Sequence, residues 1–246
     1  MKNKLLVLLP GILFLGSCSK DQIETYHLPA YVVNFENGFP GDTIFYEYSD
    51  KRMVTSARGT KKVRYDYDTK GRMISVSHIH DGADERPYIQ NTWLNHRLVG
   101  SAMLRYDHIS GEAFELISIE YQYYGDTLIT KFYKDPYQGV TYLEEWQTDA
   151  LGNLLTISRF YYSSFGSELV LSWSIESSFD DHPSPFSALQ SKTAFDVWGT
   201  NNVLYYEKRN AEDKVIKSAE YEYVYGVHDR PVAKLMGSDT LTKYVY

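Results

Sequence analysis

The chain has little cysteine and no long apolar stretch. Cys18 is the single cysteine among 246 residues, so no disulfide can form within the chain. The longest apolar run, 5–15, is too short for a transmembrane helix, which needs about 20 apolar residues. No long stretch has the periodicity of a helix. These absences predict a fold that is stabilised by packing alone and built mainly from strands.

Positive charge is also scarce. The formal net charge is −7, and removing residues 1–17 takes away two lysines and no acids. An acidic surface repels phosphate backbones, so nucleic acid is not an expected partner. The chain also lacks a Gly-x-Ser-x-Gly elbow and a phosphate-binding loop. We therefore expect a protein that is not an enzyme and binds no cofactor.

The start of the chain has the pattern of an export signal. Lys2 and Lys4 precede the short apolar run, and Gly16 and Ser17 follow it. The segment Leu-Gly-Ser-Cys at 15–18 resembles the bacterial lipobox, in which the cysteine is acylated and becomes the first mature residue. The alternative is an ordinary secretory signal with an incidental cysteine. The resemblance implies a signal peptide over 1–17, lipidation of Cys18, a tether over 18–30 and the membrane as an acyl-anchored partner.

The residues after the cysteine bear on which side of the outer membrane the protein faces. Ser-Lys-Asp-Gln at 19–22 resembles the surface-export tag of Bacteroidetes-type lipoproteins. This resemblance implies an outer-membrane protein displayed on the cell surface. The alternative is a polar tether that holds a periplasm-facing domain.

Tyrosine is abundant, with 23 copies, and it marks a repeated unit. Val63, Tyr65 and Tyr67 alternate with polar residues, which is the period of a half-buried strand. Asp68 and Gly71 then supply turn chemistry, since the aspartate can bond its own backbone and glycine accepts a positive φ. The sequence predicts a β-hairpin here.

Similar hairpin units recur along the chain. They lie at 46–54, 121–128, 146–155, 210–215 and 221–232, and another Tyr-x-Tyr strand ends the chain at 244–246. We expect one all-β domain over 31–246, an antiparallel meander of hairpins curled into a barrel-like or strongly bent sheet. Two longer connections are predicted as loops, at 163–167 and at Ser177–Ser187.

The tyrosine-rich hairpins resemble the YD repeats of bacterial surface and toxin-shell proteins. The stretches 65–73, 179–186, 201–203 and 221–232 resemble a family of uncharacterised Bacteroidetes lipoproteins, a domain of unknown function with a porin-like fold. That family implies a fold and an envelope location, and no established activity. A true transmembrane barrel is not expected, because charged segments such as 61–64 do not suit a lipid-facing strand.

Three acidic or histidine motifs are candidate catalytic or metal sites. His78 and His80 lie on one face of a predicted strand, but no third metal ligand is identifiable. The segment Asp-Asp-His at 180–182 lies between prolines and is interpreted as turn-shaping. Glu144 and Glu145 suggest a glycosidase pair, whose separation the sequence does not give. We expect no catalytic and no metal-binding residues.

An Asp-Thr-aliphatic triplet occurs three times, with its threonine at Thr43, Thr127 and Thr240. The structural interpretation is a hairpin turn that leads into a strand. The triplet also resembles the O-glycosylation signal of exported Bacteroidetes proteins, which implies glycans on these threonines. The two interpretations do not exclude each other.

Two function classes remain. The first is a non-catalytic surface binding module for a glycan or protein ligand, because Tyr and Trp rings have an apolar face and a polar edge. Its candidate anchors are the four tryptophans, Trp93, Trp146, Trp173 and Trp198. The second is a structural subunit whose edge strands or faces dock an envelope protein. A glycan-active enzyme is a more remote alternative.

Overall fold

The computed structural model describes residues 28–50, 52–79, 85–107, 109–163, 168–187 and 200–246. They form a single 17-stranded sheet. Its first nine strands are β1 (Tyr31–Glu36), β2 (Phe39–Ser49), β3 (Arg52–Arg58), β4 (Lys61–Tyr67), β5 (Met73–Ile79), β6 (Arg86–Leu94), β7 (Arg97–Tyr106), β8 (Ala113–Tyr124) and β9 (Leu128–Asp135). The rest are β10 (Gly139–Thr148), β11 (Leu154–Tyr162), β12 (Leu169–Pro183), β13 (Asn201–Asn210), β14 (Val215–Glu220), β15 (Glu222–Tyr225), β16 (Pro231–Met236) and β17 (Asp239–Val245), with a 3-10 turn, η1 (Val227–Asp229), before β16.

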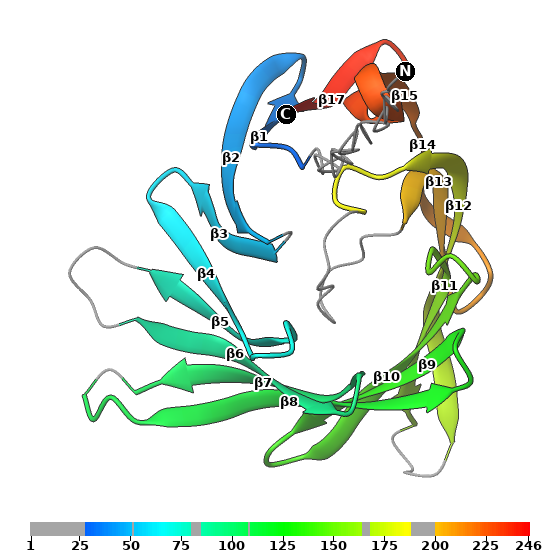
Figure 1. Cartoon of the computed structure of the whole chain (residues 1–246). Coiled ribbons are helices and arrows are strands. Elements are labelled where there is room, and N and C mark those ends of the chain that lie inside the picture. Colours follow the sequence, from blue (N-terminus) through cyan, green and yellow to red (C-terminus); the bar gives the residue numbers. More distant parts are fainter. Residues whose placement is uncertain (1–27, 51, 80–84, 108, 164–167, 188–199) are drawn as a thin grey trace, which may run out of the picture.

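The sheet curls almost into a closed barrel (Figure 1). Tyr31 in β1 pairs with Phe45 in β2 and also with Val245 in β17, so the first and last strands meet. β14 continues directly into β15 through Tyr221, and the first half bonds β13 while the second bonds β16. These two segments act as one strand, which gives the even number that an antiparallel ring requires. The predicted all-β antiparallel meander is confirmed.

The predicted turn chemistry is confirmed at the repeated unit. The Asp68 carboxylate accepts hydrogen bonds from the backbone N–H groups of Lys70 and Arg72, both at 2.9 Å. Gly71 has a φ of 79°, in the left-handed region that favours glycine. The turn at 149–153 repeats this arrangement with Asp149 bonding two backbone N–H groups. A third copy at 210–214 uses Asn210 for the same purpose.

The loop predicted at Ser177–Ser187 is wrong over most of its length, because β12 continues to Pro183. The ladder to β13 tolerates the proline through register shifts between Ser178 and Pro183. Asp180 fixes this part of the strand, since its carboxylate accepts a hydrogen bond from the backbone N–H of Asn202 at 3.0 Å.

One of the three predicted Asp-Thr turns is also wrong. Thr43 lies inside β2, because the turn falls earlier, at Asn37 and Gly38, with φ angles of 51° and 79°. An Asn-Gly pair is the preferred two-residue hairpin turn, and it determines the position here. The turns before Leu128 and at Ser238 lead into β9 and β17 as predicted.

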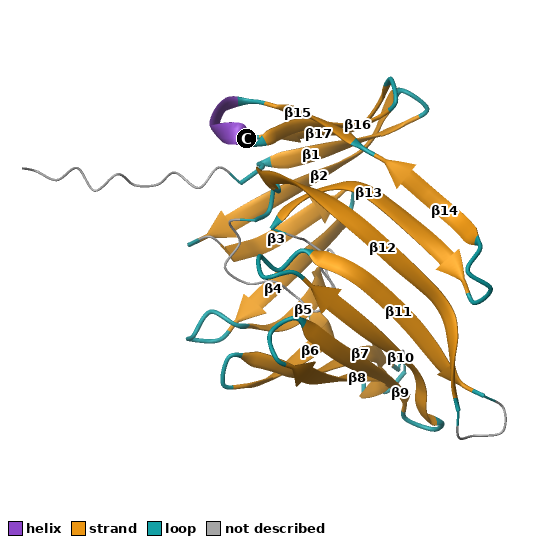
Figure 2. Cartoon of the chain, turned by 90° about the vertical axis from the view of Figure 1, so that its right-hand side faces the viewer, coloured by secondary structure: helices purple, strands orange, loops and turns teal. Residues whose placement is uncertain are grey.

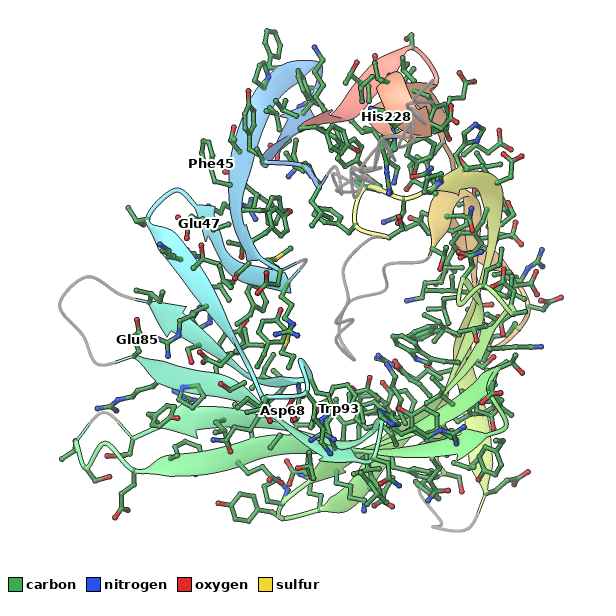
Figure 3. All side chains as sticks on the ribbon, in the orientation of Figure 1. Phe45, Glu47, Asp68, Glu85, Trp93 and His228 are labelled. Atoms are coloured by element: carbon green, nitrogen blue, oxygen red, sulfur yellow. The ribbon has the colours of Figure 1, made fainter. Side chains whose placement is uncertain are left out.

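The two faces of the sheet are distinct. Figure 3 shows Phe45 and Glu47 pointing away from the ring and Trp93 lying on its inner side. Since side chains alternate along a strand, Tyr46 of β2 faces inward. There it packs against Phe186, at 5.3 Å between ring centroids, because the turn after β12 enters the ring.

Inward tyrosines join neighbouring hairpins. Six of their hydroxyls, and one tryptophan N–H, donate to a backbone carbonyl 14 to 25 residues earlier in the chain. The donors are Tyr48, Tyr67, Tyr106, Tyr123, Tyr223, Tyr246 and Trp93. These hydrogen bonds explain the abundance of tyrosine, because each ring supplies apolar packing and a hydroxyl that is hydrogen-bonded inside the sheet.

Candidate functional site

A row of cations and aromatic rings crosses the inner face from β8 to β16. The row faces inward, because Trp93 lies on the inner side of the ring (Figure 3) and packs in the same apolar cluster as Tyr121. From Tyr121, the directly opposite residues on successive strands are Lys131, Glu144, Arg159 and then Trp173. Residues that lie opposite each other share a face of the sheet. These five side chains therefore line one continuous strip.

The buried end of the strip is a charged centre. Lys131 and Glu144 are each 3% exposed. The Glu144 carboxylate accepts hydrogen bonds from Tyr133 Oη, Trp146 Nε1 and Arg159 Nε, each at 2.9 Å. Lys131 Nζ lies 2.8 Å from the centroid of the Trp146 ring. Burial lowers the pKa of Lys131 to about 7, although the Glu144 charge opposes this shift.

The accessible end of the strip begins at Arg159. Its guanidinium carbon lies 4.4 Å from the Tyr142 ring centroid and 4.6 Å from the Trp173 centroid. Lys208 Nζ approaches Trp173 as well, at 4.1 Å. The tryptophan thus holds two cations, which places Lys208 on the same inner face as Arg159.

Two more lysines continue the row. Lys217 lies directly opposite Lys208, and its Nζ is 5.7 Å from the Tyr206 ring centroid. The Tyr206 ring stacks near Tyr221, and Lys234 Nζ lies 3.5 Å from the Tyr221 centroid. Burial lowers the pKa of Lys234 to about 8. We call Arg159, Lys208, Lys217 and Lys234 the cation row.

A second polar cluster surrounds the Asp180 carboxylate. Asp180 accepts hydrogen bonds from the Asn202 side-chain amide, at 3.1 Å, and from the Tyr225 hydroxyl. His182 stacks on Tyr225, with 4.2 Å between ring centroids, and its Nδ1 lies 2.9 Å from the Asp181 carboxylate. The cluster links β12, β13 and β15. Its groups bond to one another, which fits a role in shaping the chain.

The glycosidase pair suggested by Glu144 and Glu145 does not form. Consecutive residues of a strand point to opposite faces, so Glu144 lies buried on the inner face while Glu145 is exposed on the outer one. Two carboxylates on opposite sides of a sheet cannot flank one glycosidic bond.

The other predicted site residues are dispersed. Thr127 is exposed in the turn before β9, whereas Thr43 and Thr240 are half-buried in β2 and β17. His78 stacks on Tyr88, with 4.0 Å between ring centroids. Cys18, His80 and Trp198 lie outside the described residues. The structure therefore brings none of these described residues together as a single site.

The ring faces of the described tryptophans are not free for stacking on a ligand. Trp93 donates its indole N–H to the Met73 carbonyl at 2.8 Å, and the Arg72 guanidinium lies 5.9 Å from its ring centroid. Trp146 and Trp173 have cations over their rings. Each ring is thus part of a cation–aromatic pair.

A shallow depression of about 270 Å³ lies beside the β6–β7 turn. It is lined by Leu94, Asn95, His96, Arg97, Val99 and Tyr123. Arg97 also bonds the Asp126 carboxylate at 3.0 Å and lies over the Tyr123 ring. Since the arginine is already engaged, the depression presents mainly apolar turn atoms.

Sequence reasoning did not identify the cation row. A usable signal was present, because Lys208 follows Tyr206 by two residues and Arg159 precedes Tyr161 by two. A cation that lies two residues from an inward aromatic residue on the same strand shares its face of the sheet. The alternation that identifies the inward rings therefore also indicates positive charge on the inner face.

Among the described residues, no three His, Cys, Asp or Glu side chains gather closely enough to hold a metal ion. Within the same residues, no helix has the length and apolar character needed to cross a membrane.

Comparisons with known proteins concern the fold. No family model and no curated protein match the chain. The crystal structure of a porin-like protein from Bacteroides vulgatus ATCC 8482 aligns with a TM-score of 0.51 and 13% identity, covering 89% of this chain and 98% of that one. Crystal structures of TcdB2-TccC3, with and without Cdc42, align at a TM-score of 0.29 and 10% identity over 80% of this chain and 10% of theirs. The chain has a fold similar to that of the Bacteroides porin-like protein.

Proposed function

We propose that the protein is a non-catalytic binding module, anchored to the outer membrane by acyl chains on Cys18, which takes a glycan on the inner face of its barrel. The observation that carries the binding role is the cation row. Lys217 is exposed and the other three cations are partly buried, so the strip is reachable by solvent while its rings hold it in place. A strip that served only as core would contain fewer charges.

The outer face supports an anchored barrel over an embedded one. Glu47 pairs with Lys62 at 3.6 Å, and Arg64 pairs with Asp66 at 3.0 Å and with Glu85. Glu47 and Glu85 point away from the ring in Figure 3. A lysine or arginine facing the bilayer midplane costs about 2–4 kcal/mol. A barrel with this outer surface is better suited to water, and an acyl anchor supplies the membrane attachment.

The location is tested by changing the anchor. Full-length protein and its Cys18→Ser variant are expressed in a Bacteroidetes host, labelled with a palmitate analogue and fractionated. The wild type is expected to carry the label, to sediment with membranes and to be cut by protease added to intact cells. An unlabelled wild type, or a variant that still sediments with membranes, contradicts the anchor. A labelled protein that resists the protease supports the periplasm-facing alternative.

The structural-subunit alternative has one supporting observation. Phe39 and Phe45 in β2 are 76% and 55% exposed, and the Phe45 ring is tilted against Tyr31 on the neighbouring strand, with 5.5 Å between ring centroids. Docking through an edge strand has less support, because β1 bonds both β2 and β17. Crosslinking in cells with a photoreactive residue at Phe45 is expected to capture a specific envelope protein if this alternative holds.

A further inference from the structure

The inner-face cations differ from the outer-face cations in what neutralises them. On the outer face, Lys62 pairs with Glu47, and Lys134 pairs with Glu120. On the inner face, Lys208, Lys217 and Lys234 form no ion pair with any carboxylate among the described residues. The chain as a whole is acidic. These three lysines therefore place positive charge without a paired carboxylate on the inner face, beside the rings that they contact.

The arrangement of these cations is unfavourable without a counter-charge. Lys208 and Lys217 are directly opposite on neighbouring strands, and like charges at such positions destabilise a sheet. Lys234 is partly buried, and burial favours its neutral form. Arg159 differs from the three lysines, because it forms an ion pair with Glu144 directly opposite on β10. An anion bound to the row would relieve the repulsion and the desolvation together.

The aromatic rings favour a charged ligand over a neutral one. A neutral sugar binds aromatic residues by stacking on a free ring face. Cations lie over Trp146 and over Trp173, the latter with two. A ligand that enters the strip therefore meets ammonium and guanidinium groups supported by rings. Such groups form their strongest hydrogen bonds with carboxylate, sulfate or phosphate oxygens.

The row is elongated, which suits an extended ligand. Arg159 is on β11, Lys208 on β13, Lys217 on β14 and Lys234 on β16. Lys208 and Lys217 lie directly opposite each other, whereas Lys234 lies opposite Tyr223, six residues beyond Lys217 along the combined β14–β15 strand. An acidic polysaccharide carries charges along its whole length and can therefore reach cations that are separated along a strand as well as across strands. Such a polysaccharide has a lower charge density than a nucleic acid. An acidic barrel therefore repels it less.

We propose that Arg159, Lys208, Lys217 and Lys234 form a binding site for an anionic glycan, one that carries carboxylate or sulfate groups. This inference rests on the proposed binding function and specifies the ligand class of the same inner face. The ligand lies across β11 to β16 with its acidic groups on the cation row. The buried Lys131–Glu144 centre holds the rings in place and does not contact the ligand.

The test compares matched double substitutions in the full-length acylated protein, purified in neutral detergent. The inner variant is Lys208→Gln with Lys217→Gln, and the control is Lys62→Gln with Lys134→Gln on the outer face. Both remove two positive charges, so any effect of net charge alone is the same. Thermal unfolding checks that each variant folds. Calorimetric titration uses a polygalacturonate oligosaccharide, a heparin-derived oligosaccharide, neutral maltohexaose and a single-stranded oligonucleotide.

We expect the wild type to bind at least one of the acidic oligosaccharides and to bind maltohexaose much more weakly. The inner variant is expected to lose affinity by about tenfold or more, as removal of charge-assisted hydrogen bonds does. The control is expected to stay within about twofold, since exposed ion pairs contribute little. Added salt should weaken the wild-type complex more than that of the inner variant.

Several outcomes overturn the inference, and they separate it from the proposed function. Equal losses in the inner and outer variants would show attraction by net charge alone. Binding of maltohexaose without binding of acidic oligosaccharides would leave a glycan-binding module and remove the anionic site. Tighter binding of the oligonucleotide than of either acidic oligosaccharide would assign the row to a different ligand class. Binding of none of the four probes would overturn both proposals.

Discussion

Alkaline pH should unfold the barrel cooperatively through its buried tyrosines. Burial raises the pKa of Tyr121, Tyr133, Tyr223 and Tyr244 well above the ordinary value of 10.0. In the unfolded chain these hydroxyls lose their protons near pH 10, whereas in the folded protein they keep them. Above pH 10 the folded state therefore binds more protons, and its stability falls as the pH rises.

The size of this effect is comparable to the stability of a domain. Each tyrosine that stays protonated costs about 1.4 kcal/mol of unfolding free energy per pH unit above its unfolded pKa. The four tyrosines together cost about 6 kcal/mol by pH 11, against a typical total of about 5–15 kcal/mol. Burial raises the pKa of Tyr48 to a similar extent, so this tyrosine adds about as much, and Tyr246, whose pKa rises to about 12, adds a further cost up to that pH.

The assay follows tyrosinate absorbance and far-ultraviolet circular dichroism in one alkaline titration. Exposed tyrosines ionise without unfolding, and the remaining absorbance change is expected to coincide with loss of the dichroism signal, in a steep transition between about pH 10 and 11.5. Tyr244→Phe should make that transition less steep by about a fifth or less, since it removes one of at least five coupled groups. Tyr124→Phe is the control, because Tyr124 is exposed. Complete ionisation of the tyrosines by pH 11.5 with the sheet intact would refute the reasoning.

Three further predictions concern single positions. Lys131→Met should raise the thermal midpoint at pH 7, because it removes a charge that is costly to bury. It should also flatten the rise in stability between pH 7 and 10, a range in which the unfolded chain keeps the lysine proton and the folded chain has lost it. An unchanged pH dependence of stability would contradict the lowered pKa of Lys131. Gly71→Ala should lower the unfolding free energy by about 1–2 kcal/mol, because φ is 79° and the new Cβ would meet the Arg52 guanidinium. The control is Gly38→Ala, which has open space around the new Cβ and should cost less in the same denaturant titration. Asn202→Ala should cost about 2–4 kcal/mol by chemical denaturation, since it leaves a carboxylate with fewer donors, and a loss below about 1 kcal/mol would show that water replaces the amide.

The hairpins were predictable because their signals are local. Asp68 and Gly71 lie three residues apart, and both the side-chain acceptor and the positive φ act within that turn. The same holds for Asn210 and its turn. The loop predicted around Asp180 failed for the opposite reason. The partner that keeps Asp180 in a strand is Asn202, which lies 22 residues later.

The candidate site was beyond sequence reasoning for a similar reason. Lys208 and Lys217 are nine residues apart, and their opposition depends on the register of one hairpin. Lys234 joins them only because Tyr221, at the junction of β14 and β15, lies between Tyr206 and Lys234. Closure of the ring depends on a pairing between Tyr31 and Val245, at opposite ends of the chain. Such pairings follow from the whole meander rather than from any segment.

The junction of first and last strands makes the barrel suitable for circular permutation. The Ala30 N–H donates to the Val245 carbonyl at 2.6 Å, so the described chain returns to its starting point. Figure 2 shows the C-terminus at one rim and the β13–β14 hairpin turn at the other. A short linker across the junction, with new ends opened at that turn, would preserve every ladder and move the attachment point to the opposite rim. A lipid anchor fused there would invert the barrel, so its orientation on a membrane becomes a variable that an experimenter can set.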